Sequence, residues 1–126
     1  MHVRDVMHAG NELPSVSETA LLPLALLEMT SKGLGMTAVV DDVQRVVGII
    51  TDGDLRRVLE KSIDVRVANA REVMSLHPRT ISPDQLAVTA VEKMQSHNIN
   101  GLLVVNEAGK LVGALNMLDL LRAGIV

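Results

Sequence analysis

The chain has 126 residues, of which 48% are apolar, and a formal net charge of −3 from 12 basic and 15 acidic side chains. This length fits one domain, or two small halves that share a core. The acidic balance and the lack of Phe, Trp and Tyr argue against a nucleic-acid-binding protein, because both a basic surface and base-stacking side chains are missing.

Other function classes are excluded by residues that the chain lacks. It has no Cys, which rules out disulfides, thiolate catalysis and Cys-based zinc sites and fits a cytoplasmic protein. No apolar run approaches the roughly 18 residues that a membrane span needs, and the start at Met1–Asp5 has no signal-peptide core. We therefore expect a cytoplasmic protein with no membrane partner.

The chain contains an internal repeat. A shift of 65 residues aligns residues 15–57 with 80–122 without a gap, and twelve of the 43 aligned pairs are identical, where chance gives roughly two or three. Arg4–Met7 also matches Arg71–Met74, at a shift of 67. The sequence thus predicts two copies of one unit, related by a pseudo-twofold axis.

The first predicted unit covers residues 1–66. A short strand at Leu13–Ser17 precedes a helix that begins near Leu21, because Pro23 is tolerated only in a first helical turn. Gly33 and Gly35 allow the positive φ angles that end a helix. The remaining elements are a strand at Met36–Val40, a turn at Asp41-Asp42, a strand at Arg45–Ile50 and a helix at Asp52–Lys61.

The second predicted unit, residues 67–126, has the same order of elements. Asn98 and Asn100 replace the two glycines at the end of its first helix. Its elements are a strand at Arg79–Ser82, a helix with an apolar stripe from Leu86 to Met94, strands at Gly101–Val105 and Lys110–Leu115, and a helix at Met117–Ala123. The predicted fold class is α/β (α+β), with two β-α-β-β-α units packed through their sheets.

Two segments carry a family resemblance. Gly48–Leu55, which reads G-I-I-T-D-G-D-L, resembles the G-h-h-T-x-x-D-L signature of cystathionine-β-synthase (CBS) domains, and Gly113–Leu120 is a weaker twin. Two such units form a Bateman module. Gly33–Thr37, Thr51–Arg57 and Asp119–Gly124 further resemble the C-terminal regulatory part of bacterial arabinose-5-phosphate isomerases.

The resemblance implies a regulatory module and no catalysis by this chain alone. The module would bind a nucleotide or nucleotide-sugar in the clefts between the repeats and control an attached sugar-isomerase domain, which is absent here. An isomerase of this kind serves lipopolysaccharide biosynthesis, so the CMP conjugate of 3-deoxy-D-manno-octulosonic acid is one candidate ligand and an adenine nucleotide is the other. The alternative is a ligand-free module that only holds isomerase subunits together.

Thr51 and Asp54 admit two interpretations. They fit a capping box at a helix start, and they equally fit a site where a carboxylate accepts both hydroxyls of a ribose, which is the role that the CBS resemblance implies. Asn116 and Asp119 form the second such pair, although the isomerases often have His where this chain has Asn116 and Leu118. Arg56 either neutralises a phosphate or sugar acid or is a solvated helix residue.

Without aromatic residues, a bound base would lie between aliphatic side chains and be recognised by backbone groups. The candidates are two helix-end segments and the first strands of both units: Gly35, Met36 and Thr37; Asn100, Gly101 and Leu102; Ser15 and Val16; Thr80 and Ile81.

We expect no metal site and no cofactor. Asp52-Gly53-Asp54 continues into Leu55-Arg56-Arg57 and so lacks the distal carboxylate of a calcium loop. The histidines do not have the spacing of metal ligands, and surface roles explain them: His2, His8, His77 and His97.

A homodimer is the expected assembly. Apolar side chains recur on the closing helices of the two units, and exposed apolar patches usually mark a partner surface. These residues are Leu55, Val58 and Leu59 with Leu118 and Leu121.

Overall fold

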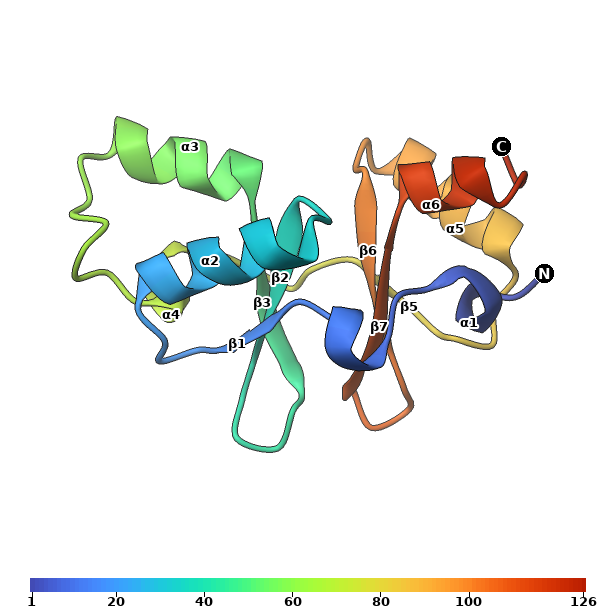
Figure 1. The fold of residues 1–126 in the computed structure, drawn as a ribbon, viewed down its shortest axis with the longest axis horizontal. Helices are drawn as coiled ribbons and strands as arrows, with labels where there is room; N and C mark the ends of the chain where they lie inside the picture. Colours follow the sequence, from blue (N-terminus) through green and yellow to red (C-terminus); the bar gives the residue numbers. More distant parts are fainter. The chain divides into compact units, whose positions relative to one another are not determined.

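A computed structural model describes all 126 residues, and the chain forms two compact units. The central unit is Pro14–Pro78, and the terminal unit combines Met1–Leu13 with Arg79–Val126 (Figure 1). This division differs from the sequence repeats. Residues 1–13 join the body of the second repeat, and residues 67–78 join the body of the first.

The central unit has a four-stranded sheet in the order β1-β2-β3-β4. β1 is parallel to β2, and the other two pairings are antiparallel. Its elements are β1 (Ser15–Ser17), α2 (Leu22–Lys32), β2 (Met36–Val40), β3 (Val46–Thr51), α3 (Asp52–Glu60), α4 (Ala70–Val73) and β4 (Ser75–Leu76).

The terminal unit repeats this topology with a three-stranded sheet in the order β5-β6-β7, again parallel and then antiparallel. His8 forms an isolated antiparallel bridge to Ala114 of β7, at the position that β4 occupies in the central unit. Its elements are α1 (Val3–Val6), the 3₁₀ turn η1 (Gly10–Glu12), β5 (Thr80–Ile81), α5 (Ala87–Ser96), β6 (Gly101–Val105), β7 (Leu111–Asn116) and α6 (Met117–Arg122).

These elements confirm the predicted α/β class and the β-α-β-β-α order in both units. Even an irregularity recurs, because the β2–β3 ladder shifts register between Val39 and Val40 and the β6–β7 ladder shifts between Val104 and Val105. The first long helix starts after Leu21, with Pro23 in its first turn, as predicted.

The helix ends agree with prediction except at one residue. Gly33, Gly35 and Asn98 have positive φ angles of 69°, 74° and 53°. Asn100 does not, so the prediction for that residue was wrong. One residue in the left-handed conformation, Asn98, is enough to end α5 before β6 begins.

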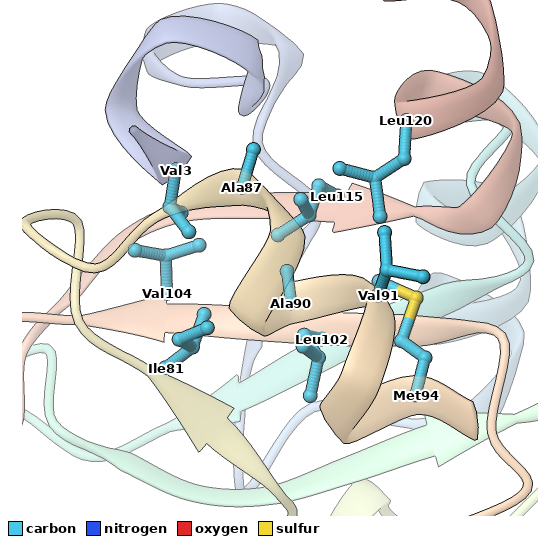
Figure 2. Close-up of a cluster of buried hydrophobic side chains, with 10 residues drawn as sticks. All are labelled: Val3, Ile81, Ala87, Ala90, Val91, Met94, Leu102, Val104, Leu115 and Leu120. Carbon is cyan, nitrogen blue, oxygen red and sulfur yellow. The ribbon is translucent and has the colours of Figure 1, made fainter. Parts of the chain in front are cut away.

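Each unit has its own apolar core. In the terminal unit, Val3 of α1 is fully buried and packs with side chains of α5, β6 and β7 (Figure 2). In the central unit, Ala70 and Val73 of α4 are buried beside β3 and α3. The helices α1 and α4 were not predicted, because helices of four residues are too short to show a clear apolar period.

Candidate functional site

Asp54 lies at the start of α3, directly after β3, and its side chain is only 3% exposed. One carboxylate oxygen, Oδ2, accepts hydrogen bonds from the Thr51 backbone N–H at 2.9 Å and from the Thr51 hydroxyl at 3.1 Å. The first bond is the carboxylate half of a capping box. Both residues of the predicted pair therefore act on each other in this structure.

The other oxygen of Asp54, Oδ1, has two further donors. The Ser75 hydroxyl donates from 2.6 Å, and the Arg57 guanidinium also bonds to it. A carboxylate has about four lone-pair sites, so the protein already occupies the acceptor capacity of Asp54. A ribose would have to displace donors here, and Arg57 is the most accessible of them because its side chain is 55% exposed.

Asp119 is placed in the same way at the start of α6 but has different partners. Its Oδ2 accepts from the Asn116 N–H at 2.8 Å, and Asn116 Oδ1 accepts from the Asp119 N–H at 2.9 Å, which completes a capping box. Its Oδ1 is 2.8 Å from Nε2 of His8. Arg122, the counterpart of Arg57, forms no ion pair with it. Asp119 is 12% exposed and has fewer partners than Asp54.

His8 bridges two carboxylates. Its Nδ1 is 2.6 Å from Oε1 of Glu12, while its Nε2 contacts Asp119. Partial burial lowers the pKa of His8, but the hydrogen bonds and charges of Glu12 and Asp119 outweigh this effect and raise the pKa above its ordinary value of 6.5. The prediction of a mere surface role for His8 was therefore wrong.

Ser75 and His8 were both missed as site residues, although the sequence contained a signal. Each directly follows the methionine that aligns the two repeats, Met74 or Met7, and so occupies the same repeat position. Their contacts with Asp54 and Asp119 arise because each repeat's opening segment packs on the body of the other repeat.

The structure brings some of the predicted base-binding residues next to these aspartates. In the central unit, Met36 pairs with Thr51, which places Gly35 beside the start of α3. In the terminal unit, Gly101 pairs with Asn116. Both carboxylate sites thus have the first residue of a neighbouring strand at their edge.

Other predicted residues have side chains that are buried or hydrogen-bonded within the protein. Val16, Met36 and Ile81 are buried, and the buried Thr37 hydroxyl donates to the Ala38 carbonyl at 3.1 Å. These four residues offer mainly backbone groups to a ligand.

The first strands are also held by partners from the neighbouring helix. The Ser15 N–H donates to Glu28 at 3.0 Å, whereas the Thr80 carbonyl accepts from Lys93 at 2.7 Å. Arg56 is exposed and forms no ion pair, so it is available to an anion.

A pocket of about 230 Å³ lies beside β5 and β6 of the terminal unit. It includes Thr80 and Ile81 but neither Asn116 nor Asp119. No group of three His, Asp or Glu side chains has an arrangement that could hold a metal ion. None of the helices has both the length and the apolar character needed to cross a membrane.

The family model for the CBS domain matches residues 3–61 and again residues 70–125. This chain belongs to the CBS domain family. The two matches cover nearly all of it, so the chain is a CBS domain pair, and the aspartates of both units lie in the resembling signature segments.

The curated relatives that match this chain are isomerases. The chain is 48% identical to arabinose 5-phosphate isomerase KdsD of Pseudomonas aeruginosa over all 126 residues, which make up 39% of that protein. It is 47% identical to KdsD of Escherichia coli K12, again over its full length and 38% of the relative. The chain thus spans less than half the length of these relatives.

Solved structures agree on the fold. A CBS domain protein from Pyrobaculum aerophilum, complexed with AMP, is 25% identical, with a TM-score of 0.84 over 95% of this chain and 90% of the other. CBSX2 in complex with AMP has the same TM-score at 24% identity and covers 98% of this chain and 96% of that one.

Proposed function

We propose that this CBS pair is a regulatory module that binds a nucleotide through its ribose hydroxyls at Asp54 and Asp119. The observation that carries the proposal is the matched placement of these carboxylates, each three residues after the end of a strand and beside the first residue of the neighbouring, preceding strand. A cis-diol can donate two charge-assisted hydrogen bonds to a carboxylate.

An adenine nucleotide is the favoured ligand. The protein from Pyrobaculum aerophilum, which shares this fold at 25% identity, is complexed with AMP. The base would contact the backbone at Gly35–Thr37 or Gly101 and at the first strands, because the side chains there are aliphatic or buried. Arg56 would meet a phosphate. The CMP conjugate of 3-deoxy-D-manno-octulosonic acid remains the second ligand to test.

The attached activity would be an arabinose-5-phosphate isomerase. The support is the 48% identity to KdsD together with the part of that relative that this chain does not cover. We infer that the module adjusts this isomerase in the cytoplasm, in the supply of a lipopolysaccharide sugar, in response to the bound nucleotide.

Calorimetric titration with AMP and with the CMP-sugar tests the proposal. We expect AMP to bind, and Asp119→Ala to weaken binding roughly ten- to a few-hundredfold, since each lost charge-assisted bond is worth about 1.5–3 kcal/mol. The same titration of Asp54→Ala tests the site in the central unit. Arg122→Ala is the matched control, because Arg122 is exposed and unpaired.

Two outcomes would count against the proposal. If neither nucleotide binds, the module is not a nucleotide sensor. If AMP binds the parent and both aspartate variants equally, the ribose assignment is wrong and the carboxylates only cap their helices.

We also propose that the chain forms a homodimer through exposed apolar residues of the closing helices. Leu59 of α3 is 72% exposed, and Leu118 and Leu121 of α6 are 47% and 54% exposed. Val58, which we expected on this surface, is 3% exposed and lies in the central core, so that assignment was wrong. A second copy is the occupant that would cover such residues by symmetric closure.

A further inference from the structure

The N-terminal segment, residues 1–13, contacts the rest of the terminal unit, residues 79–126, at two places. At α1, Val3 is fully buried, its N–H donates to the Gln85 carbonyl at 2.8 Å, and the Ala87 N–H donates to the Met1 carbonyl at 2.8 Å. At the other place, His8 and Ala114 exchange backbone hydrogen bonds of 2.8 and 3.0 Å. At the first place Arg4 also pairs with Asp84, and His2 lies beside Asp5. The second place includes the imidazole of His8, whose two ring nitrogens both contact carboxylates.

Both ring nitrogens of His8 face carboxylates, at 2.6 Å from Glu12 and 2.8 Å from Asp119. A neutral imidazole has one N–H donor, whereas the imidazolium has two. Carboxylates only accept, so both contacts exist together only when His8 is protonated. The charged groups that face the ring are Glu12 of η1 and Asp119 of α6, and β7 contributes no charged residue.

The equivalent contact in the central unit does not titrate in this way. Ser75 contacts Asp54 through a hydroxyl at 2.6 Å, and the cation there is the guanidinium of Arg57, so no imidazole takes part. The two units thus hold equivalent aspartates with chemically different partners.

We propose that His8 is a protonation-dependent clasp that fastens the N-terminal segment to Asp119, while the matching contact of Ser75 with Asp54 is independent of pH. His8 is a positioning residue, because it acts on the carboxylate and not on a ligand. The clasp links the second candidate site to the segment at the start of this chain, so a change at Asp119 reaches residues 1–13. The proposal depends only on contacts within the terminal unit and not on a bound nucleotide.

The direction of the pH effect follows from linkage. Because the pKa of His8 is raised in the folded state, the clasp contributes its full stability below pH 6.5 and loses it as the pH rises through the folded-state pKa. The N-terminal segment is therefore expected to open more readily at alkaline pH.

Amide hydrogen exchange of the whole chain between pH 5.5 and 8.5 tests the clasp without any ligand. The reporter is the His8 N–H, which donates to the Ala114 carbonyl. After correction for the intrinsic exchange rate, we expect its protection to fall as the pH rises, by about tenfold for each unit by which the pKa of His8 is raised. The Met74 N–H, which donates to Ala70 in the equivalent opening segment of the other unit, is the comparison reporter and should show no such step.

His8→Ser is the decisive variant, because it installs the residue that the other repeat has at Ser75. We expect it to remove the pH step, and we expect Asp119→Asn to shift the NMR titration midpoint of the His8 ring downward. An unchanged step in His8→Ser, or a His8 midpoint at or below 6.5 in the parent, would overturn the clasp. These results do not depend on AMP, so the clasp and the proposed nucleotide site fail separately.

Discussion

The Ser75 hydroxyl donates a 2.6 Å hydrogen bond to the buried carboxylate of Asp54, although the two residues belong to different sequence repeats. The bond is made possible by the pairing of β4 with β3, which sets Ser75 opposite Ile49, just before the start of α3. The opening segment of one repeat therefore orients the carboxylate of the other. Any ligand that moves Asp54 must also act on this segment.

Ser75→Ala should destabilise the chain by about 1.5–3 kcal/mol, the usual contribution of a hydrogen bond to a charged group. Urea unfolding of parent and variant measures the difference. Ser31→Ala is the control, because Ser31 is exposed on α2. If Ser75→Ala lowers the free energy of unfolding no more than the control does, the hydrogen bond contributes little to stability in solution.

Gly48→Ala should be strongly destabilising. A Cβ at Gly48 would overlap the side chain of Met74, with its Cγ only 2.8 Å away and its sulfur closer still. Overpacking of this kind typically costs about 1–3 kcal/mol. Gly53→Ala is the matched control, because its Cβ would meet nothing nearer than 3.6 Å.

Thermal unfolding of both glycine variants measures the effect. Shortening the thioether side chain with Met74→Ala should restore part of the stability lost in Gly48→Ala. If Gly48→Ala unfolds at the same temperature as Gly53→Ala, the close approach of Met74 is not a constraint in solution.

The free energy of unfolding should decrease in acid, because the Glu28 carboxylate becomes protonated. Partial burial raises the pKa of Glu28, but hydrogen bonds from Lys32 and the Ser15 N–H outweigh it and hold the pKa below its ordinary value of 4.5. The contribution is therefore complete above pH 4.5 and is lost as the pH falls through the folded-state value. Urea unfolding at pH 7 and pH 3.5 measures how much the free energy of unfolding falls in acid. This fall should be smaller in Glu28→Gln than in the parent. An equal fall would mean that Glu28 does not contribute to the acid sensitivity.

The proposed homodimer should dissociate when its apolar residues become charged. Leu118→Lys and Leu121→Lys add a charge where each side chain is about half exposed, so the fold should tolerate them. Light scattering over a range of concentrations should show a dimer for the parent and a monomer for the double variant. Val88→Lys, at a similarly exposed residue on α5, is the control, and a monomeric parent at high concentration would refute the dimer.

The β-α-β-β-α order, its duplication and the aspartates at the closing helices were all predictable from the sequence. Apolar periodicity and turn residues are local signals that can be recognised in the sequence. The 65-residue repeat shows the same pattern a second time and so supports each predicted element. The segment Met36–Val40 has the same bounds in prediction and structure, because a short apolar run between turn residues has few alternatives.

Only the tertiary structure decided which opening segment packs on which body. That choice depends on Val3 and Val73 reaching the core of a unit formed mainly by the other repeat, and no local pattern records contacts between residues so far apart along the chain. It also decided the chemistry around the aspartates. Asp54 and Asp119 occupy equivalent positions in the two repeats, yet Ser75 contacts one and His8 contacts the other. Both partners come from segments that reach the aspartates only in the folded chain.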